Sequence, residues 1–76
     1  MRINLETAVS TANLGTLASV VNISDPSGYR SELYLDRTYA LSVSNGHISF
    51  KSGANYKLDN QRELDDIVRE MASYYQ

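Results

Sequence analysis

The sequence predicts an α+β fold, in which a four-stranded antiparallel β-meander carries a C-terminal amphipathic helix on one face. Two observations predict it. Asn45-Gly46 stands between two runs of alternating apolar and polar residues, and apolar residues recur at helical spacing from Leu64 onward. Asn-Gly is the strongest short-range hairpin signal, because both central residues of a type I′ turn need positive φ. The 76 residues are expected to form one domain spanning 1–76.

Residues 1–14 fit two alternatives. A short helix at about 5–13 would use Asn4 as its N-cap, with Gly15 just past its end. A strand would also fit, because Ile3 and Leu5 alternate with polar residues. We favour the helix.

The next two strands are expected at about 16–24 and 29–36, joined through Asp25-Pro26-Ser27-Gly28. Proline at the second position and glycine at the fourth favour a type I turn followed by a bulge. A loop formed by Pro26, Ser27 and Gly28 would place Val21 opposite Leu33, so that both lie on the apolar face. A four-residue loop would instead place Val21 opposite Glu32. The hydrophobic pattern therefore favours the three-residue loop.

The second hairpin is expected to join strands at about 38–44 and 47–52, after a tight link at Asp36-Arg37. A two-residue loop at Asn45-Gly46 sets its register. The expected pairs are Ser44 with His47, Val43 with Ile48 and Leu41 with Phe50.

These registers give the sheet one apolar face and one mixed face. The apolar face is predicted to hold Leu17, Val21, Ile23, Leu33, Leu35, Tyr39, Leu41, Val43, Ile48 and Phe50. The opposite face is predicted to hold Val20, Asn22, Arg30, Glu32, Tyr34, Ser42, His47, Ser49 and Lys51.

The C-terminal helix is expected at about 60–75. Asn60 is a good N-cap, and Glu63 stands three residues later, as in a capping box. One apolar stripe faces the sheet. Its members are Leu64, Ile67, Val68, Met71 and Tyr75.

Charge is concentrated at this end of the chain. The formal net charge is −2, and residues 59–76 hold five acidic against two basic side chains. Four of the acids recur at spacings of four, three and four residues, which aligns them on the solvent side of the helix. They are Asp59, Glu63, Asp66 and Glu70. Such a row is explained first by a solvated helix face, and alternatively by imitation of a phosphate backbone that occupies a basic nucleic-acid channel on another protein.

Several function classes are disfavoured. The chain has one histidine, His47, and no cysteine, and it shows no catalytic, metal-binding or nucleotide-binding motif. We therefore expect no enzyme, cofactor or metal. The charged, interrupted N-terminus predicts neither a signal peptide nor a membrane span, so a cytoplasmic protein is expected.

Two further surfaces are candidates for binding. Tyr34 and His47, with Arg30 and Lys51, could contact single-stranded nucleic acid on the outer sheet face. A second copy of the chain could bind at an unpaired sheet edge or at Tyr74-Tyr75-Gln76, so a homodimer is possible.

In its size, acidity, lack of cysteine and lack of catalytic motifs, the chain resembles as a class the small inhibitors of phages and mobile elements, such as anti-CRISPR proteins. No residues carry over from that resemblance. It implies a non-enzymatic module that blocks a surface of a host protein complex. The alternative is a weak single-stranded nucleic-acid binder. The predicted partner contacts are Asp59, Glu63, Asp66, Glu70, Tyr34 and His47.

Overall fold

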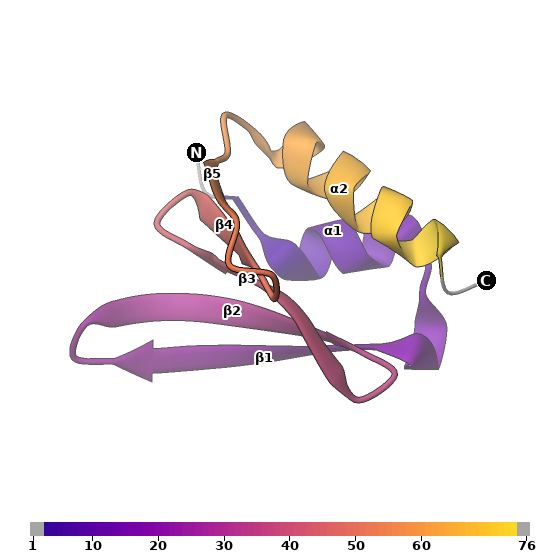
Figure 1. Ribbon diagram of the computed structural model, residues 1–76, viewed down its shortest axis with the longest axis horizontal. Helices are drawn as coiled ribbons and strands as arrows, with labels where there is room; N and C mark the ends of the chain where they lie inside the picture. The colour runs from indigo at the N-terminus through magenta and orange to yellow at the C-terminus, as the bar shows by residue number, and fades with distance from the viewer. Residues whose placement is uncertain (1–2, 75–76) are drawn as a thin grey trace.

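The computed structural model describes residues 3–74, which form an antiparallel sheet with two helices on one face (Figure 1). The strands follow one another in the order β1-β2-β3-β4-β5. The elements are α1 (Leu5–Ala12), the 3₁₀ turn η1 (Gly15–Leu17), β1 (Ala18–Asp25), β2 (Gly28–Leu35), β3 (Thr38–Ser44), β4 (His47–Phe50), β5 (Asn55–Lys57) and α2 (Gln61–Ser73). The predicted α+β class, the C-terminal helix and the short N-terminal helix are confirmed. The predicted strand count of four is wrong, because the sheet has five.

The fifth strand was missed because it is only three residues long and follows a Ser-Gly-Ala segment that is typical of a connecting loop. Its turn closes through two backbone hydrogen bonds, Gly53 N to Phe50 O and Phe50 N to Ala54 O, both 2.9 Å. The Ser49 hydroxyl also donates to Asn55 Oδ1 across the two strands. Pairing with β4 thus stabilises a segment with little strand propensity of its own.

Both ends of α1 are defined by asparagine. Asn4 Oδ1 accepts a hydrogen bond from Thr7 N at 3.1 Å, as expected of an N-cap. The helix ends at Ala12, one residue before the predicted end, and Asn13 rather than Gly15 caps it in the left-handed conformation with φ 55°. Gly15 begins η1 instead.

The turn and register of the β3–β4 hairpin and the N-cap of α2 are as predicted, but β4 ends at Phe50, two residues before the predicted end. Ser44, Val43 and Leu41 lie opposite His47, Ile48 and Phe50. Asn60 Oδ1 accepts a hydrogen bond from Glu63 N at 3.0 Å, and the Glu63 carboxylate accepts one from Asp59 N. The buried side of α2 holds Leu64, Val68 and Ala72, whereas Tyr75 lies outside the described residues.

The predicted register of the first hairpin is wrong. Asp25 lies directly opposite Gly28, which leaves a two-residue loop, and Val21 therefore lies opposite Glu32. The Asp25 carboxylate closes this loop by accepting hydrogen bonds from both the amide and the hydroxyl of Ser27, at 3.0 and 2.6 Å. This local closure outweighs the hydrophobic pattern.

The corrected register exchanges the two faces of β1. Val20 lies opposite Leu33 and packs against the core, whereas Val21 is on the outer face and 43% exposed. Ile23 also moves to the outer face, opposite Arg30. The polar side chain of Asn22 can lie on the inner face because its hydrogen-bonding groups have partners. It donates a hydrogen bond to the Glu6 carboxylate and accepts one from the Ser31 hydroxyl.

A second face assignment changes in β3. The register between β2 and β3 shifts between Leu33 and Tyr34, so that Tyr39 lies opposite Tyr34 on the outer face. The consecutive residues Ala40 and Leu41 are both buried as a result. Tyr39 is therefore not part of the apolar face, contrary to the prediction.

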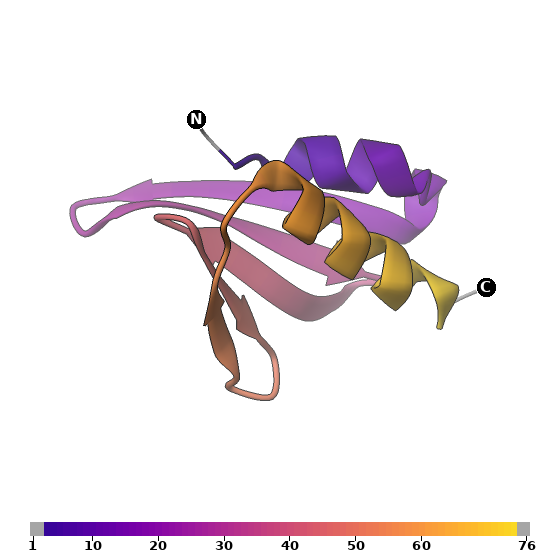
Figure 2. The same ribbon diagram turned by 90° about the horizontal axis from the view of Figure 1, so that it is seen from above.

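The helices lie side by side on the inner face of the sheet (Figures 1 and 2). The buried core comprises Leu5, Ala8, Leu14, Leu33, Leu35, Ala40, Leu41, Val43, Ile48, Leu58, Leu64, Val68 and Ala72. Among the described residues, no helix is long and apolar enough to cross a membrane.

A side chain joins the starts of the two helices, which are far apart in sequence. Gln61 Oε1 accepts a hydrogen bond from Asn4 N at 2.6 Å, and Gln61 Nε2 donates to Asn4 O at 2.9 Å. Gln61 Nε2 also donates to Asp65 Oδ1 at 2.8 Å, which holds the amide in place. This Gln61 clamp fixes the N-terminus of α1 beside that of α2.

Replacing Gln61→Ala should lower the free energy of unfolding by about 1–2 kcal/mol, since both bonds to Asn4 are lost. Urea denaturation followed by circular dichroism measures it. The neighbouring exposed Arg62→Ala is the control and should change stability by less than about 0.5 kcal/mol. Equal effects of the two variants would contradict a role for the clamp.

Candidate functional site

The β1–β2 hairpin extends beyond the ends of both helices (Figure 1). An open cleft lies between the start of β2, the β3–β4 turn and the segments at the starts of the two helices. Its volume is about 630 Å³. The lining residues come from four segments: Ile3 and Leu5; Tyr29 and Ser31; Val43, Ser44, Asn45 and Gly46; and Leu58, Asp59 and Asn60. The cleft was not predicted from the sequence.

The walls of the cleft are tied to one another by hydrogen bonds. The Ser44 hydroxyl donates to Tyr29 O at 3.1 Å, which connects β3 to the start of β2. Leu58 N donates to Gly46 O at 2.7 Å, which connects the segment before α2 to the β3–β4 turn. The cleft is therefore largely formed before any ligand binds.

The cleft combines apolar and polar surface with one anionic group. The lining residues Val43 and Leu58 are buried, whereas the lining residue Tyr29 is 51% exposed. Asp59 is the one carboxylate among the lining residues. An arginine or lysine side chain matches this arrangement, because its aliphatic stem can cover apolar surface while its charged end reaches a carboxylate or lies on an aromatic ring.

Asp59 is also the first member of the predicted acidic row. All four members, Asp59, Glu63, Asp66 and Glu70, are exposed. Two of them already have partners within their own helix region, since Glu63 caps α2 and Asp66 lies 3.2 Å from Arg69. Asp59 and Glu70 are therefore the members best placed to contact another molecule.

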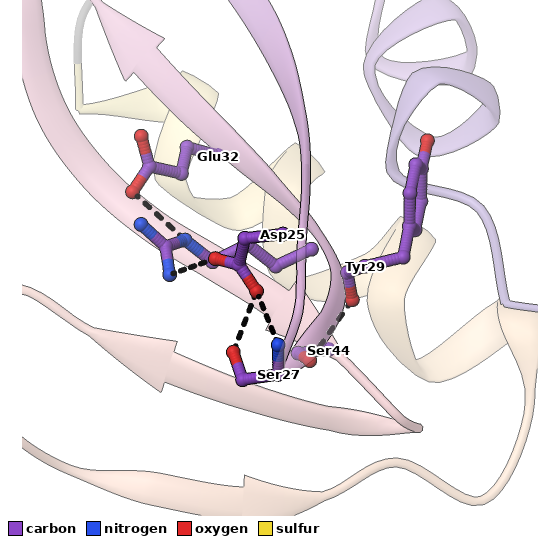
Figure 3. Close-up of polar contacts among 6 residues, drawn as sticks. Asp25, Ser27, Tyr29, Glu32 and Ser44 are labelled. Atoms are coloured by element: carbon purple, nitrogen blue, oxygen red, sulfur yellow. Dashed lines mark hydrogen bonds and ion pairs between the residues drawn. The ribbon is translucent and has the colours of Figure 1, made fainter.

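The outer sheet face differs from the predicted nucleic-acid surface. Arg30 lies 3.4 Å from Glu32 and 3.9 Å from Asp25, so two carboxylates compensate its charge (Figure 3). The Tyr34 hydroxyl donates to Glu32 at 3.1 Å, and its ring packs edge-on against Tyr39 with the centroids 5.9 Å apart. The hydrogen bond to the Glu32 carboxylate raises the pKa of Tyr34 above 10.0.

The remaining predicted contacts on this face are dispersed. His47 is exposed, with Nδ1 3.1 Å from Asn45 O, and Lys57 lies opposite it on β5. Lys51 follows the other end of β4, where its amide donates to Ala40 O at 3.0 Å. The structure thus does not bring His47 and Tyr34 together with a cluster of cations.

The sequence carried one signal for the cleft. Asn22, Ser24, Tyr29 and Ser31 alternate with other residues in the two strands, so a two-residue loop places this polar group on the inner face. Figure 3 shows the Tyr29 side chain directed away from the carboxylates of Asp25 and Glu32. The three-residue loop predicted from the sequence places Asn22 on the outer face, whereas Tyr29 and Ser31 share the face of Leu33 in either register.

No protein-family model matches the chain, and no curated protein or solved structure matches it either. Within residues 3–74, no three histidine or acidic side chains lie close enough together to hold a metal ion. The site is therefore described by its own geometry alone.

The pKa of Asp25 gives a test of the hairpin turn. The Ser27 hydroxyl, helped by the Ser27 amide and Arg30, holds this pKa below its ordinary value of 3.8. A folded-state pKa below the unfolded value contributes stability above about pH 4, and this contribution is lost as the pH falls through the folded pKa. Replacing Ser27→Ala should raise the pKa of Asp25, as measured by NMR titration of its carboxyl carbon.

The control for this titration is Arg30→Gln. The Arg30 charge lowers the pKa of Asp25 less than the Ser27 hydrogen bond does, so this variant should raise the pKa less than Ser27→Ala. If Asp25 of the unmodified protein titrates at 3.8 or above, the turn geometry is wrong.

Proposed function

We propose that this chain is a non-enzymatic protein-binding module that contacts its partner through the cleft and the adjoining acidic row. The acidic cleft surface is defined as the cleft together with Glu63, Asp66 and Glu70. The observation that carries the proposal is that Asp59 belongs to both parts. A single partner surface could therefore place a side chain in the cleft and further cations along α2.

The partner expected for this surface is basic. A cation in the cleft would lie between the Tyr29 ring and Asp59, and partial removal of water would strengthen that contact. Glu70 would add a weaker interaction near the other end of α2, of the exposed kind that salt screens. Binding should accordingly be strongest at low ionic strength.

The sharpest form of the proposal is an inhibitor. A module that covers a basic surface prevents that surface from binding its normal ligand. A small cytoplasmic inhibitor of phage or mobile-element type would act in this way by occupying a nucleic-acid channel of a host complex. Size, acidity and the lack of cysteine support this form as a class resemblance only. The single-stranded nucleic-acid alternative has weaker support, because Arg30 is already compensated by two carboxylates.

Titration with a short arginine-rich peptide at low ionic strength tests the cleft, with NMR of the labelled protein as the readout. Amide shifts should concentrate at Tyr29, Asp59 and Asn60. Replacing Asp59→Asn should weaken binding about two- to tenfold, because one partly desolvated charge contact is lost. The same peptide with citrulline in place of arginine should bind much more weakly.

Asp36→Asn is the matched control, since it removes one exposed acid from the β2–β3 turn, where Asp36 has φ 50° and asparagine is tolerated. If Asp59→Asn and Asp36→Asn weaken peptide binding equally, the loss of affinity reflects the net charge of the protein and not the cleft, which would contradict the proposal.

A second experiment asks whether the acidic row contributes. Glu70→Gln should reduce retention of the partner from a host lysate at low salt, whereas Asp36→Asn should not. Glu63 is left unchanged, because its carboxylate caps α2 and its replacement would weaken the helix itself. If neither Asp59→Asn nor Glu70→Gln reduces retention of the partner, this surface is excluded as the contact.

A further inference from the structure

The outer edge of β1 is an unpaired strand edge. Among residues 3–74, β1 pairs with β2 only, and the sheet order places it at one end. β1 has eight residues, and its single charged residue is Asp25 at the C-terminal end. Edge strands are usually kept from pairing by lysine, proline, a bulge or shortness. The other edge strand, β5, is three residues long and contains Lys57, but β1 has none of these protections before Asp25.

The backbone groups that face outward can be identified from one hydrogen bond. Asp36 N donates to Leu17 O at 2.9 Å, which continues the β1–β2 pairing by one residue. Residues of an antiparallel strand bond alternately to one side and to the other. Val21 and Ile23, in phase with Leu17, therefore bond toward β2. The outward groups are those of Ala18, Val20, Asn22 and Ser24.

We infer that β1 pairs with β1 of a second copy of this chain, antiparallel about a two-fold axis at Val21. This register pairs Ala18 with Ser24 of the second copy, and Val20 with its Asn22. All four outward-facing residues of each strand then pair, which forms roughly eight backbone hydrogen bonds. The two five-stranded sheets become one continuous sheet.

Side chains also fit this register. Val21 lies on the outer face, 43% exposed, and would meet Val21 of the second copy as a pair without direct backbone bonds, where side chains approach most closely. Ile23 would lie opposite Ser19. The charged Asp25 would lie opposite Leu17, so no like charges in β1 face each other. A second copy fits better than an unrelated strand because Val21, the apolar residue at the centre of the edge, would then contact Val21 of the second copy.

Single cysteines test the register, since the chain has no cysteine of its own. Under mild oxidation Val21→Cys should form a disulfide-linked dimer, because residue 21 of each copy is opposite the other. Ser19→Cys alone should not, because residue 19 faces residue 23 of the second copy. Mixing Ser19→Cys with Ile23→Cys should restore cross-linking.

Sedimentation equilibrium tests the association without cross-linking. The unmodified protein should reach a mass of about twice 8.5 kDa at high concentration. Val21→Lys should weaken dimerisation about tenfold or more while leaving the circular dichroism spectrum unchanged, because residue 21 is exposed in one copy. It should also leave binding of the arginine-rich peptide unchanged, so that this inference and the proposed function can fail separately.

Three results would overturn the inference. One is a mass of 8.5 kDa at every concentration up to about 1 mM. Another is cross-linking of Ser19→Cys as fast as that of Val21→Cys. The third is a dimer that Val21→Lys does not weaken, which would place the contact elsewhere, for example at Tyr74.

Discussion

The structure depends on two short helices covering one face of a sheet that is longer than they are. The eight residues of α1 span about 12 Å and the thirteen of α2 about 20 Å, whereas the eight residues of β1 extend about 27 Å. The helices therefore close the core over Leu33 and Leu41 but leave the end of the β1–β2 hairpin uncovered. The inner face of that end is polar, and the cleft forms there.

The sequence predicted local structure correctly where the residue types of a turn or a helix cap favour a single backbone geometry. Asn45-Gly46 specified both the turn and the register of its hairpin, and Asn60 with Glu63 specified the start of α2. The first hairpin failed because two signals disagreed. The apolar pattern favoured Val21 on the inner face, but the Asp25 carboxylate closes a two-residue loop by bonding to Ser27, and this local interaction determined the register.

The candidate site was predictable only in part. The exposed acidic row follows from helical spacing alone, and the structure places all four carboxylates on the exposed side. The cleft requires contacts between residues far apart in the chain, such as the clamp between Asn4 and Gln61, which no periodicity reveals. The ion pairs of Arg30 on the outer face were not predictable, because counts of charged residues in the sequence do not show that Arg30 lies between two carboxylates. Of the two proposed contact surfaces, the β1 edge is the one that depends on the corrected register of β1, because that register decides which backbone groups face outward.

The assignment of the two faces of β1 is thus the central claim, and a carbon-edited nuclear Overhauser experiment on the methyl groups of Val20 and Val21 tests it most directly. The structure predicts contacts from Val20 to Leu33 on the inner face, and contacts from Val21 to Glu32 with none to the helices. Contacts from Val21 to Leu33 or to α1 would contradict the register, and with it the set of backbone groups proposed to face outward at the β1 edge.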